Sequence, residues 1–428
     1  MKRRLLILIL LGLAAAGCAT KRPLGVAPTP LDVVAPTPDE IHTSIDRGVA
    51  YLLASQLSDG SWGRSHARRM GIDTQLSSRA DFEMATTALA VQSLIEVGAV
   101  DTPEGLAAVE RGEAWILKHL PGYRYALDRE MFNIWGHAYA IEAILTILEH
   151  RPMTDERRAE WGTLVDLQIR LLVAYESSRG GWGYYINHPV KRPPDHWALS
   201  FMTASVLITL HEAQEAGFDV PRGTVATGLR ALQISRGPDG GFSYSINYLP
   251  EHSTGPNRGA GAMARTHACS LAMRLWGDPL ITDDVFTNWL NRFIARIGWI
   301  DMERKKPWAH TGEYQTAGYY YYYGMYYAAR VLEHLPEDDQ PFYKDQLARL
   351  LVDRQDGDGT WWDFPLYDYF QGYGTALAIM SLQRCLPAEA PAPPPPVHDH
   401  AMAPSPVAAD GTDDDTEHLP SVPVDPTP

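Results

Sequence analysis

The sequence predicts an all-α fold, an (α/α)6 toroid of six outer–inner helix pairs, with a disordered N-terminal linker and a disordered C-terminal tail. Three observations lead to this prediction. A turn rich in glycine and aromatic residues recurs within residues 38–387. The segments between these turns alternate between amphipathic and almost entirely apolar helices. The residues outside this region are rich in proline and lack the apolar periodicity of a packed chain.

The recurring turn has four clear copies. They read SQLSDGSWG from Ser55, SSRGGWGYY from Ser177, SRGPDGGFSYS from Ser235 and DRQDGDGTWW from Asp353. Their spacing is roughly 60 residues, or twice that where an intermediate copy has degenerated. The segments HLPGYRY near Gly122 and RIGWIDM near Trp299 fill the two remaining positions. The chain therefore contains six units of similar length.

Each unit begins with an amphipathic helix that ends at the turn, as expected of a helix with one face in solvent. These outer helices are predicted at 41–56, 105–120, 155–176, 222–235, 283–297 and 343–354. A helix that is apolar on nearly every face follows in each unit, at 86–97, 137–148, 201–213, 266–276, 321–335 and 374–386. A helix that is apolar all round is buried, so this second set should form an inner barrel. An open helical solenoid is the alternative, but a closed ring leaves no apolar ends to cap.

The composition of the turn indicates a structural role. Asp59 and Gly60 supply turn chemistry and a positive φ angle. Trp62 can then fold back against neighbouring helices as a large apolar plug. Gln56, at the end of the first outer helix, is placed to hydrogen-bond a neighbouring helix. This interpretation is favoured over a role of the turn tryptophans in ligand binding.

The segment Gly48–Gly63, GVAYLLASQLSDGSWG, resembles the QW repeat of squalene and oxidosqualene cyclases and the related repeat of protein prenyltransferase β subunits. Gly180–Tyr184 and Asp356–Trp362 carry the same pattern less completely, and the resemblance covers about residues 40–386. It implies the α/α toroid, which the periodicity predicts independently. It implies much less about activity, because one fold hosts unrelated functions.

The catalytic signatures of these families are missing from the predicted ring. Squalene-type cyclases protonate an alkene with a DxDD cluster, and no such cluster lies within residues 38–387. Prenyltransferases hold zinc with an Asp, a nearby Cys and a distant His, and the chain has no D-x-C sequence. His267 and Cys269 are two residues apart on one helix and face different directions, so no zinc site is expected there. The sequence predicts no metal and no cofactor, and it leaves open whether the protein is an enzyme.

In a closed ring, the residues that enter the inner helices line its mouth, where helix N-termini favour anions or hydrogen-bond acceptors. On this basis the candidate pocket or catalytic residues are Asp81, Glu83, Trp135, His137, Asp195, His196, Trp197, His267, Tyr321, Tyr322, Tyr323 and Tyr373. The run of five tyrosines that begins at Tyr319 is the most unusual feature of the mouth. Successive helical residues are about 100° apart, so these side chains cannot all face the core. They provide a stacking surface for a sugar, an isoprenoid chain or an aromatic group, or they pack between helices.

Asp195 and His196 are the best acid–base pair in the sequence, because a neighbouring histidine and an aromatic wall can shift the pKa of a carboxyl group. The alternative is that Asp195 caps the third inner helix. His137 and His267 are either hydrogen-bonded core histidines or catalysts. A glycan hydrolase or lyase needs a placed pair of carboxylates, which the acidic candidates are able to supply.

Residues 1–17 are predicted to be a lipoprotein signal peptide. The basic residues KRR at positions 2–4 precede the apolar stretch Leu5–Leu13, which is too short for a stable membrane span. The sequence Ala15–Cys18 resembles a bacterial lipobox, which implies cleavage before Cys18 and lipidation of that residue. An ordinary secretory signal with an incidental cysteine is the alternative.

Several acyl chains on one residue anchor a protein stably. Ala19, which follows the cysteine, resembles an outer-membrane sorting signal of Gram-negative bacteria. The predicted location is therefore the outer membrane, with the protein lipid-anchored on its periplasmic face. Residues 18–37 are predicted to be the lipidated cysteine and a flexible linker, and residues 388–428 a disordered Pro/Asp-rich tail.

The formal net charge of −15 argues against a nucleic-acid partner, because phosphate binding needs a concentrated basic surface. The expected partners are the membrane, through the Cys18 lipid, a small-molecule or glycan ligand, and an envelope protein. The leading hypothesis is an envelope lipoprotein whose aromatic centre binds an apolar or glycan-like ligand or a protein. The alternatives are a divergent terpenoid cyclase-like or polysaccharide-processing enzyme, and a purely structural module.

Cys269 and Cys385 are expected to be buried free thiols, with a disulfide between them as the alternative.

Overall fold

The computed structural model describes residues 26–63, 79–123, 133–183, 198–246, 257, 259–306, 312–365 and 369–387. The chain separates into two compact units, Met1–Pro387 and Ala388–Pro428, and all described residues belong to the first. Residues 18–25 of the predicted linker and residues 388–428 of the predicted tail lie outside the described residues.

The described chain is helical, with two isolated β-bridges and no named strand among the described residues. The outer helices are α2 (Pro38–Ser55), α4 (Pro103–His119), α6 (Asp155–Ala174), α8 (Arg222–Ser235), α10 (Asp283–Asp301) and α13 (Gln340–Asp353). The inner helices are α3 (Arg79–Glu96), α5 (Asn133–His150), α7 (Ser200–Glu215), α9 (Thr266–Leu275), α12 (Tyr321–Leu332) and α14 (Tyr369–Cys385). Short helical turns lie at Ala99–Asp101, Leu120–Gly122, Gly259–Ala262 and, as α11, Thr316–Tyr319.

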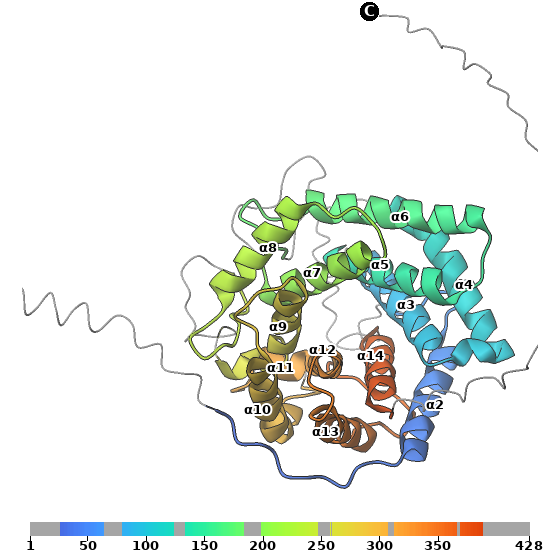
Figure 1. Ribbon diagram of the computed structural model, residues 1–428. Helices are drawn as coiled ribbons and strands as arrows, with labels where there is room; N and C mark the ends of the chain where they lie inside the picture. The colour runs from blue at the N-terminus through green and yellow to red at the C-terminus, as the bar shows by residue number, and fades with distance from the viewer. Residues whose placement is uncertain are drawn as a thin grey trace, which may run out of the picture. The chain divides into compact units, whose positions relative to one another are not determined.

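The inner helices form a closed ring. Each contacts the next, in the order α3, α5, α7, α9, α12 and α14, and α14 then packs against α3. Figure 1 looks down this ring, with the outer helices arranged around the inner set. The predicted all-α toroid of six outer–inner pairs is therefore confirmed, and the open solenoid is excluded.

Burial follows the two predicted helix patterns. In the inner helix α7, every residue from Ser200 to Leu210 is buried. In the outer helix α2, buried positions such as Ile41, Ile45 and Leu52 recur at helical spacing along one face. Thr37 and Glu40 form a capping box at the start of α2, which satisfies backbone N–H groups that the first helical turn leaves unpaired.

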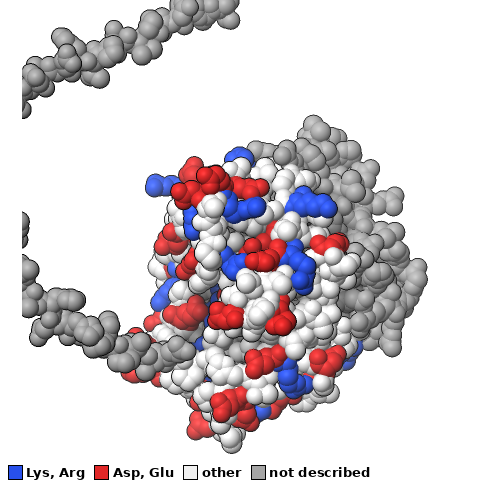
Figure 2. Space-filling view, turned by 90° about the vertical axis from the view of Figure 1, so that its right-hand side faces the viewer, with Lys and Arg blue, Asp and Glu red and all other residues white. Residues whose placement is uncertain are grey.

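On the molecular surface, acidic and basic side chains are interspersed over the face in Figure 2.

Three of the Gly/aromatic turns share one hydrogen-bonding pattern. The indole N–H groups of Trp62, Trp182 and Trp361 each donate, over 2.8 Å, to the carbonyl oxygen of the residue ten positions earlier. The backbone N–H of each tryptophan donates to a threonine hydroxyl on the following inner helix. The glycine two positions before each tryptophan has a φ angle between 88° and 96°, which glycine adopts without steric cost. The turn thus joins each outer helix to its inner partner.

Glutamine side chains at these turns link neighbouring units. Gln56 Nε2 donates to Ala108 O on α4, over 2.8 Å. Gln355 Nε2 donates to Ser44 O on α2, over 2.9 Å, and so joins the last unit to the first. This geometry agrees with the interhelical hydrogen bond expected for Gln56, and it reinforces closure of the ring.

The fifth unit differs from the sequence prediction. The segment RIGWIDM was expected to form a turn, but α10 continues through it to Asp301. Ile297 and Ile300 extend the apolar stripe of that helix into the core, so burial favours further helical turns. Trp299 falls on the opposite face and is 62% exposed, so it does not act as a plug.

Residues 26–37 are extended and run past the outer helices α10 and α13 (Figure 1). Ala27 N donates to Asn288 Oδ1, and Gln346 Nε2 donates to Leu31 O, each over 2.7 Å.

Cys269 and Cys385 are buried free thiols, as expected. No helix within the described ranges is long and apolar enough to cross a membrane.

Candidate functional site

An aromatic pocket opens at the end of the ring where the inner helices begin. Its cavity volume is ≈ 60 Å³. Nine of its twelve lining residues are aromatic, and they come from the first turns of four inner-layer segments. The lining consists of Phe82, Ala85, Thr86, Leu89, Trp135, Tyr139, Tyr319, Tyr320, Tyr323, Tyr369, Phe370 and Tyr373.

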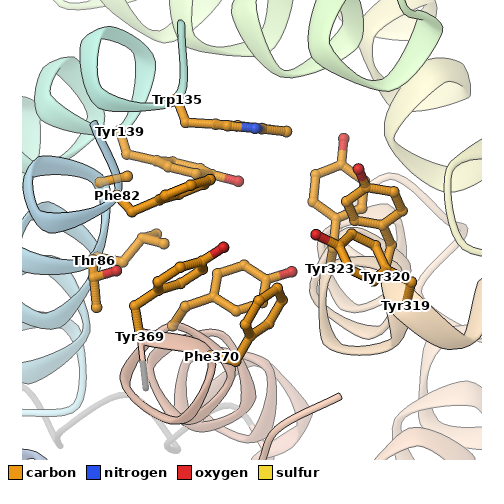
Figure 3. Close-up of a pocket in the computed structure, with 12 residues that line it drawn as sticks. Phe82, Thr86, Trp135, Tyr139, Tyr319, Tyr320, Tyr323, Tyr369 and Phe370 are labelled. Atoms are coloured by element: carbon orange, nitrogen blue, oxygen red, sulfur yellow. The ribbon is translucent and has the colours of Figure 1, made fainter. Parts of the chain in front are cut away.

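The aromatic side chains converge from three sides, as Figure 3 shows. Phe82 on α3 stacks on Tyr369 of α14, with ring centroids 4.3 Å apart. Trp135 stacks on Tyr139 of the same helix at 5.4 Å and meets Tyr323 of α12 edge-on at 6.0 Å. Such contacts between rings hold the walls rigid while leaving ring faces and edges toward the cavity.

The pocket is electrically neutral, because its polar groups are hydroxyls and no charged side chain lines it. Burial raises the pKa of Tyr139, Tyr323 and Tyr373 well above the ordinary tyrosine value, so these hydroxyls stay protonated. Tyr323 donates to Phe201 O over 3.0 Å. Tyr139 Oη has no hydrogen-bond partner within the described part of the chain and is available to a ligand.

Three predicted site residues, Trp135, Tyr323 and Tyr373, line this pocket. Tyr321 and Tyr322 do not. They are buried on another side of α12, where the Arg304 guanidinium lies over their rings at 5.5 and 5.8 Å. The helical rotation of about 100° per residue separates them from Tyr323.

Asp81 and Glu83 flank the pocket residue Phe82 in sequence, but they do not line the cavity. Asp81 is fully buried, and the Tyr123 hydroxyl donates to its Oδ1 over 2.5 Å. Glu83 Oε1 accepts a hydrogen bond from the Ser61 hydroxyl over 2.9 Å. The two carboxylates therefore engage the loop side chains beside the pocket.

His137 and His267 are core residues. His137 Nδ1 lies 2.6 Å from Gln168 Oε1, and burial lowers the pKa of His137 to about 4. His267 packs edge-on against Phe293 at 5.1 Å, and burial lowers its pKa to about 3. Both imidazoles are neutral at neutral pH, and neither lines the aromatic pocket.

Four predicted residues, Cys18, Asp195, His196 and Trp197, lie outside the described residues. Conversely, the pocket contains residues that the prediction did not select, among them Phe82, Thr86 and Tyr139. Their spacing was a usable signal, because Phe82 and Thr86, like Trp135 and Tyr139, are four residues apart and share a helix face. Within the described ranges, no group of three or more His, Cys, Asp or Glu side chains is placed to hold a metal ion.

No protein-family model matches the sequence, and no curated protein sequence matches it either. Among solved structures, the GH76A α-1,6-mannanase from Salegentibacter sp. HEL1_6 aligns with a TM-score of 0.51 and 11% identity, over 81% of this chain and 98% of that chain. The cellobiose 2-epimerase from Spirochaeta thermophila DSM 6192 aligns with a TM-score of 0.50 and 13% identity, over 81% and 96%. A type II terpene cyclase from Scytonema aligns with a TM-score of 0.48 and 12% identity, over 81% and 97%.

The mannanase and the epimerase share the α/α toroid with the present chain. At 11–13% identity the likeness concerns the fold alone. The chain is therefore an α/α toroid protein, and its placement within the squalene cyclase and prenyltransferase family remains a hypothesis.

Proposed function

We propose that this protein is a lipid-anchored binding protein of the bacterial outer membrane, facing the periplasm, whose toroid holds the apolar part of a small ligand. The observation that carries the proposal is the aromatic pocket at the ring mouth. Its neutral walls favour an apolar group over a charged one, since an unpaired charge is costly to bury. The lipobox-like sequence ending at Cys18 supports the membrane anchor.

The size of the pocket limits what it takes. A cavity of ≈ 60 Å³ is several times the roughly 10–15 Å³ that one water needs. It is far smaller than the roughly 300–1,000 Å³ of a typical drug-sized ligand site. The pocket therefore takes one ring or one chain end, such as the end of an isoprenoid, while the rest of the ligand stays outside. The hydroxyls of Thr86 and Tyr139 supply the polar contacts that fix its orientation.

The test uses the chain from Ala19 to Pro428, which lacks only the signal peptide and the lipidated cysteine. Small molecules that co-purify with it are identified by mass spectrometry, and farnesol is titrated while tryptophan fluorescence is followed. Ala85→Leu places three extra carbon atoms in the pocket and should abolish farnesol binding. Ala159→Leu, the same change on the exposed face of α6, is the matched control.

Retention of farnesol binding by a folded Ala85→Leu variant would contradict the proposed site. Binding of α-1,6-mannotriose in place of farnesol would assign the pocket to a glycan. Capture of neither probe and no co-purifying molecule would favour an envelope protein as the partner.

A second candidate function is an enzyme on the same scaffold, of the terpenoid cyclase or polysaccharide-processing kind. The observation that favours it is the buried Asp81 carboxyl, which sits next to the pocket residue Phe82 and is held by the Tyr123 hydroxyl. The test is to incubate the protein with its co-purified ligand and to search for product. Loss of product in Asp81→Asn with binding retained supports catalysis, whereas an unchanged ligand with the wild-type protein leaves binding as the function.

A further inference from the structure

A second and larger cavity lies at the opposite end of the ring, where the inner helices end. Its volume is ≈ 1140 Å³. It is lined by the last turns of α3, α5, α7 and α14. Five carboxylate residues face it, namely Glu96, Glu142, Glu149, Glu212 and Glu215. Helix C-termini carry partial negative charge, so backbone and side chains alike favour a cation here.

Two arginine side chains at the cavity form ion pairs with glutamates, and a third, Arg158, donates to Leu148 O over 3.0 Å. Arg384 Nη1 lies 2.8 Å from Glu96 Oε2, and Arg384 Nε lies 3.1 Å from Glu333 Oε1. Arg330 on α12, whose side chain is 11% exposed, forms an ion pair with Glu212. These contacts neutralise Glu96 and Glu212 but leave Glu142 without a cationic partner within hydrogen-bonding distance among the described residues.

Glu142 occupies the floor of the cavity and is 1% exposed. Its Oε1 accepts a hydrogen bond from the Thr209 hydroxyl over 2.5 Å. Its Oε2 has no hydrogen-bond partner in the described part of the chain. Gln92 lines the same cavity; its amide nitrogen donates to Glu96, and its Oε1 has no partner among the described residues. Two buried side-chain oxygens thus lack a hydrogen-bond partner, which is costly unless a ligand or water supplies one.

We propose that this cavity is a binding site for an organic cation that carries a primary ammonium group, which donates to Glu142 Oε2 and Gln92 Oε1. An ammonium group has three N–H donors and no acceptor, which complements two orphaned oxygens. The site would take either a free amine or a lysine side chain of a partner, because both present the same group. It is independent of the aromatic pocket at the other end of the ring.

Binding is coupled to release of one proton. Burial, together with the Glu212 charge, raises the pKa of Glu142 to about 8, so the free protein holds this carboxyl protonated at neutral pH. When the ammonium enters, the carboxyl gives its proton to solvent and the ion pair N–H⁺···⁻O forms. The apparent affinity therefore rises about tenfold between pH 6 and pH 7 and levels off above the pKa of Glu142.

Other charged or titratable groups surround Glu142 on every helix that packs near it. They are Tyr139 and Glu149 on α5, Glu96 on α3, Arg158 on α6, Glu212 and Glu215 on α7, Tyr326, Tyr327 and Arg330 on α12, and Arg384 on α14, with His150 and His211 lining the same cavity. Arginines and buried tyrosines keep one protonation state near neutral pH. The histidines remain in a Glu142→Gln variant, which therefore separates their titration from that of Glu142.

The experiment is isothermal titration calorimetry on the chain from Ala19 to Pro428. Cadaverine and Nα-acetyl-lysine methylamide are the two probes, each titrated at pH 6, 7 and 8 in two buffers of different ionisation enthalpy. The wild-type protein should bind at least one probe with release of about one proton at pH 7 and with affinity that increases with pH. Glu142→Gln should lose both the proton release and at least tenfold in affinity at pH 8. Glu104→Gln, which removes an exposed carboxylate on α4, should behave as wild type.

Preference for cadaverine would indicate a free amine as the ligand, and preference for the lysine derivative would indicate a lysine of a partner protein. The proposal is overturned if neither probe binds at millimolar concentration to the folded protein. It is equally overturned if folded Glu142→Gln binds the probe with unchanged affinity and pH dependence.

Discussion

Replacing Glu142 by Gln should change how the stability of the fold depends on pH. The variant keeps the shape of the side chain and the oxygen that accepts the Thr209 hydrogen bond. It removes the carboxyl group whose pKa is raised from 4.5 to about 8 by burial and by the nearby Glu212 charge. The amide has no proton to lose, so it stays neutral across this range.

The sign and size of the effect follow from this shift. A carboxyl with a higher pKa in the folded protein than in the unfolded chain binds more protons in the folded state, so folding stability falls as the pH rises. The contribution is fully present below about pH 4.5 and is lost progressively up to about pH 8. One pKa unit corresponds to about 1.4 kcal/mol. The wild type should therefore lose about 3 kcal/mol relative to Glu142→Gln on going from pH 4.5 to pH 7.

The assay is urea unfolding of both proteins followed by circular dichroism, at about pH 5, pH 6, pH 7 and pH 8. The difference in the free energy of unfolding should grow in favour of the variant as the pH rises. The control variant Glu104→Gln should have the same free energy of unfolding as the wild type at each pH, because that side chain is exposed. The reasoning would be refuted if the free energies of unfolding of the wild type and Glu142→Gln differed by the same amount at the lowest and the highest pH.

Three further predictions concern the fold and the anchor. Trp361→Phe should cost about 3 kcal/mol in urea unfolding, since it removes the indole bond to Leu351 O, some buried area and some packing volume; a loss no larger than that of the exposed Trp299→Phe would contradict this. Burial also raises the pKa of Asp363 to about 8, so this carboxyl likewise lowers the free energy of unfolding as the pH rises. Asp363→Asn should remove this decrease, and a variant whose free energy of unfolding keeps the pH dependence of the wild type would contradict the prediction. Cys18→Ser should move the protein from the membrane to the soluble fraction on ultracentrifugation, and continued membrane association would rule out the lipid anchor.

The helix pairs were predictable because they rest on local periodicity. An inner helix must be apolar on all faces, and an outer helix on one, so the alternation is visible along the chain. The starts of the inner helices were less accurate. The prediction began the second inner helix at His137, whereas α5 begins at Asn133 and buries Ile134 and Trp135. Gly136 interrupts the helical pattern directly before His137, and a glycine is a weak helix former, so the predicted boundary fell one turn late.

The pocket was predictable only in outline. The expectation that an aromatic mouth lies where inner helices begin agrees with the positions of Trp135, Tyr323 and Tyr373. The direction of each side chain depends on the rotation of its helix, which is why the adjacent Tyr322 lies elsewhere. Glu142 was not among the predicted residues, although a lone glutamate in the apolar run HAYAIEAILTIL was a signal of a buried polar site.

The sequence by itself determined the number of helix pairs, the layer to which each helix belongs and the glycine positions of the turns. These properties depend on residues close together in the chain, through helical periodicity and backbone conformation. Only the tertiary structure decided that α14 meets α3, that nine aromatic rings enclose one small pocket, and that Glu142 faces a separate polar cavity. These features join residues up to hundreds of positions apart, and their geometry arises from how twelve helices pack around a closed ring.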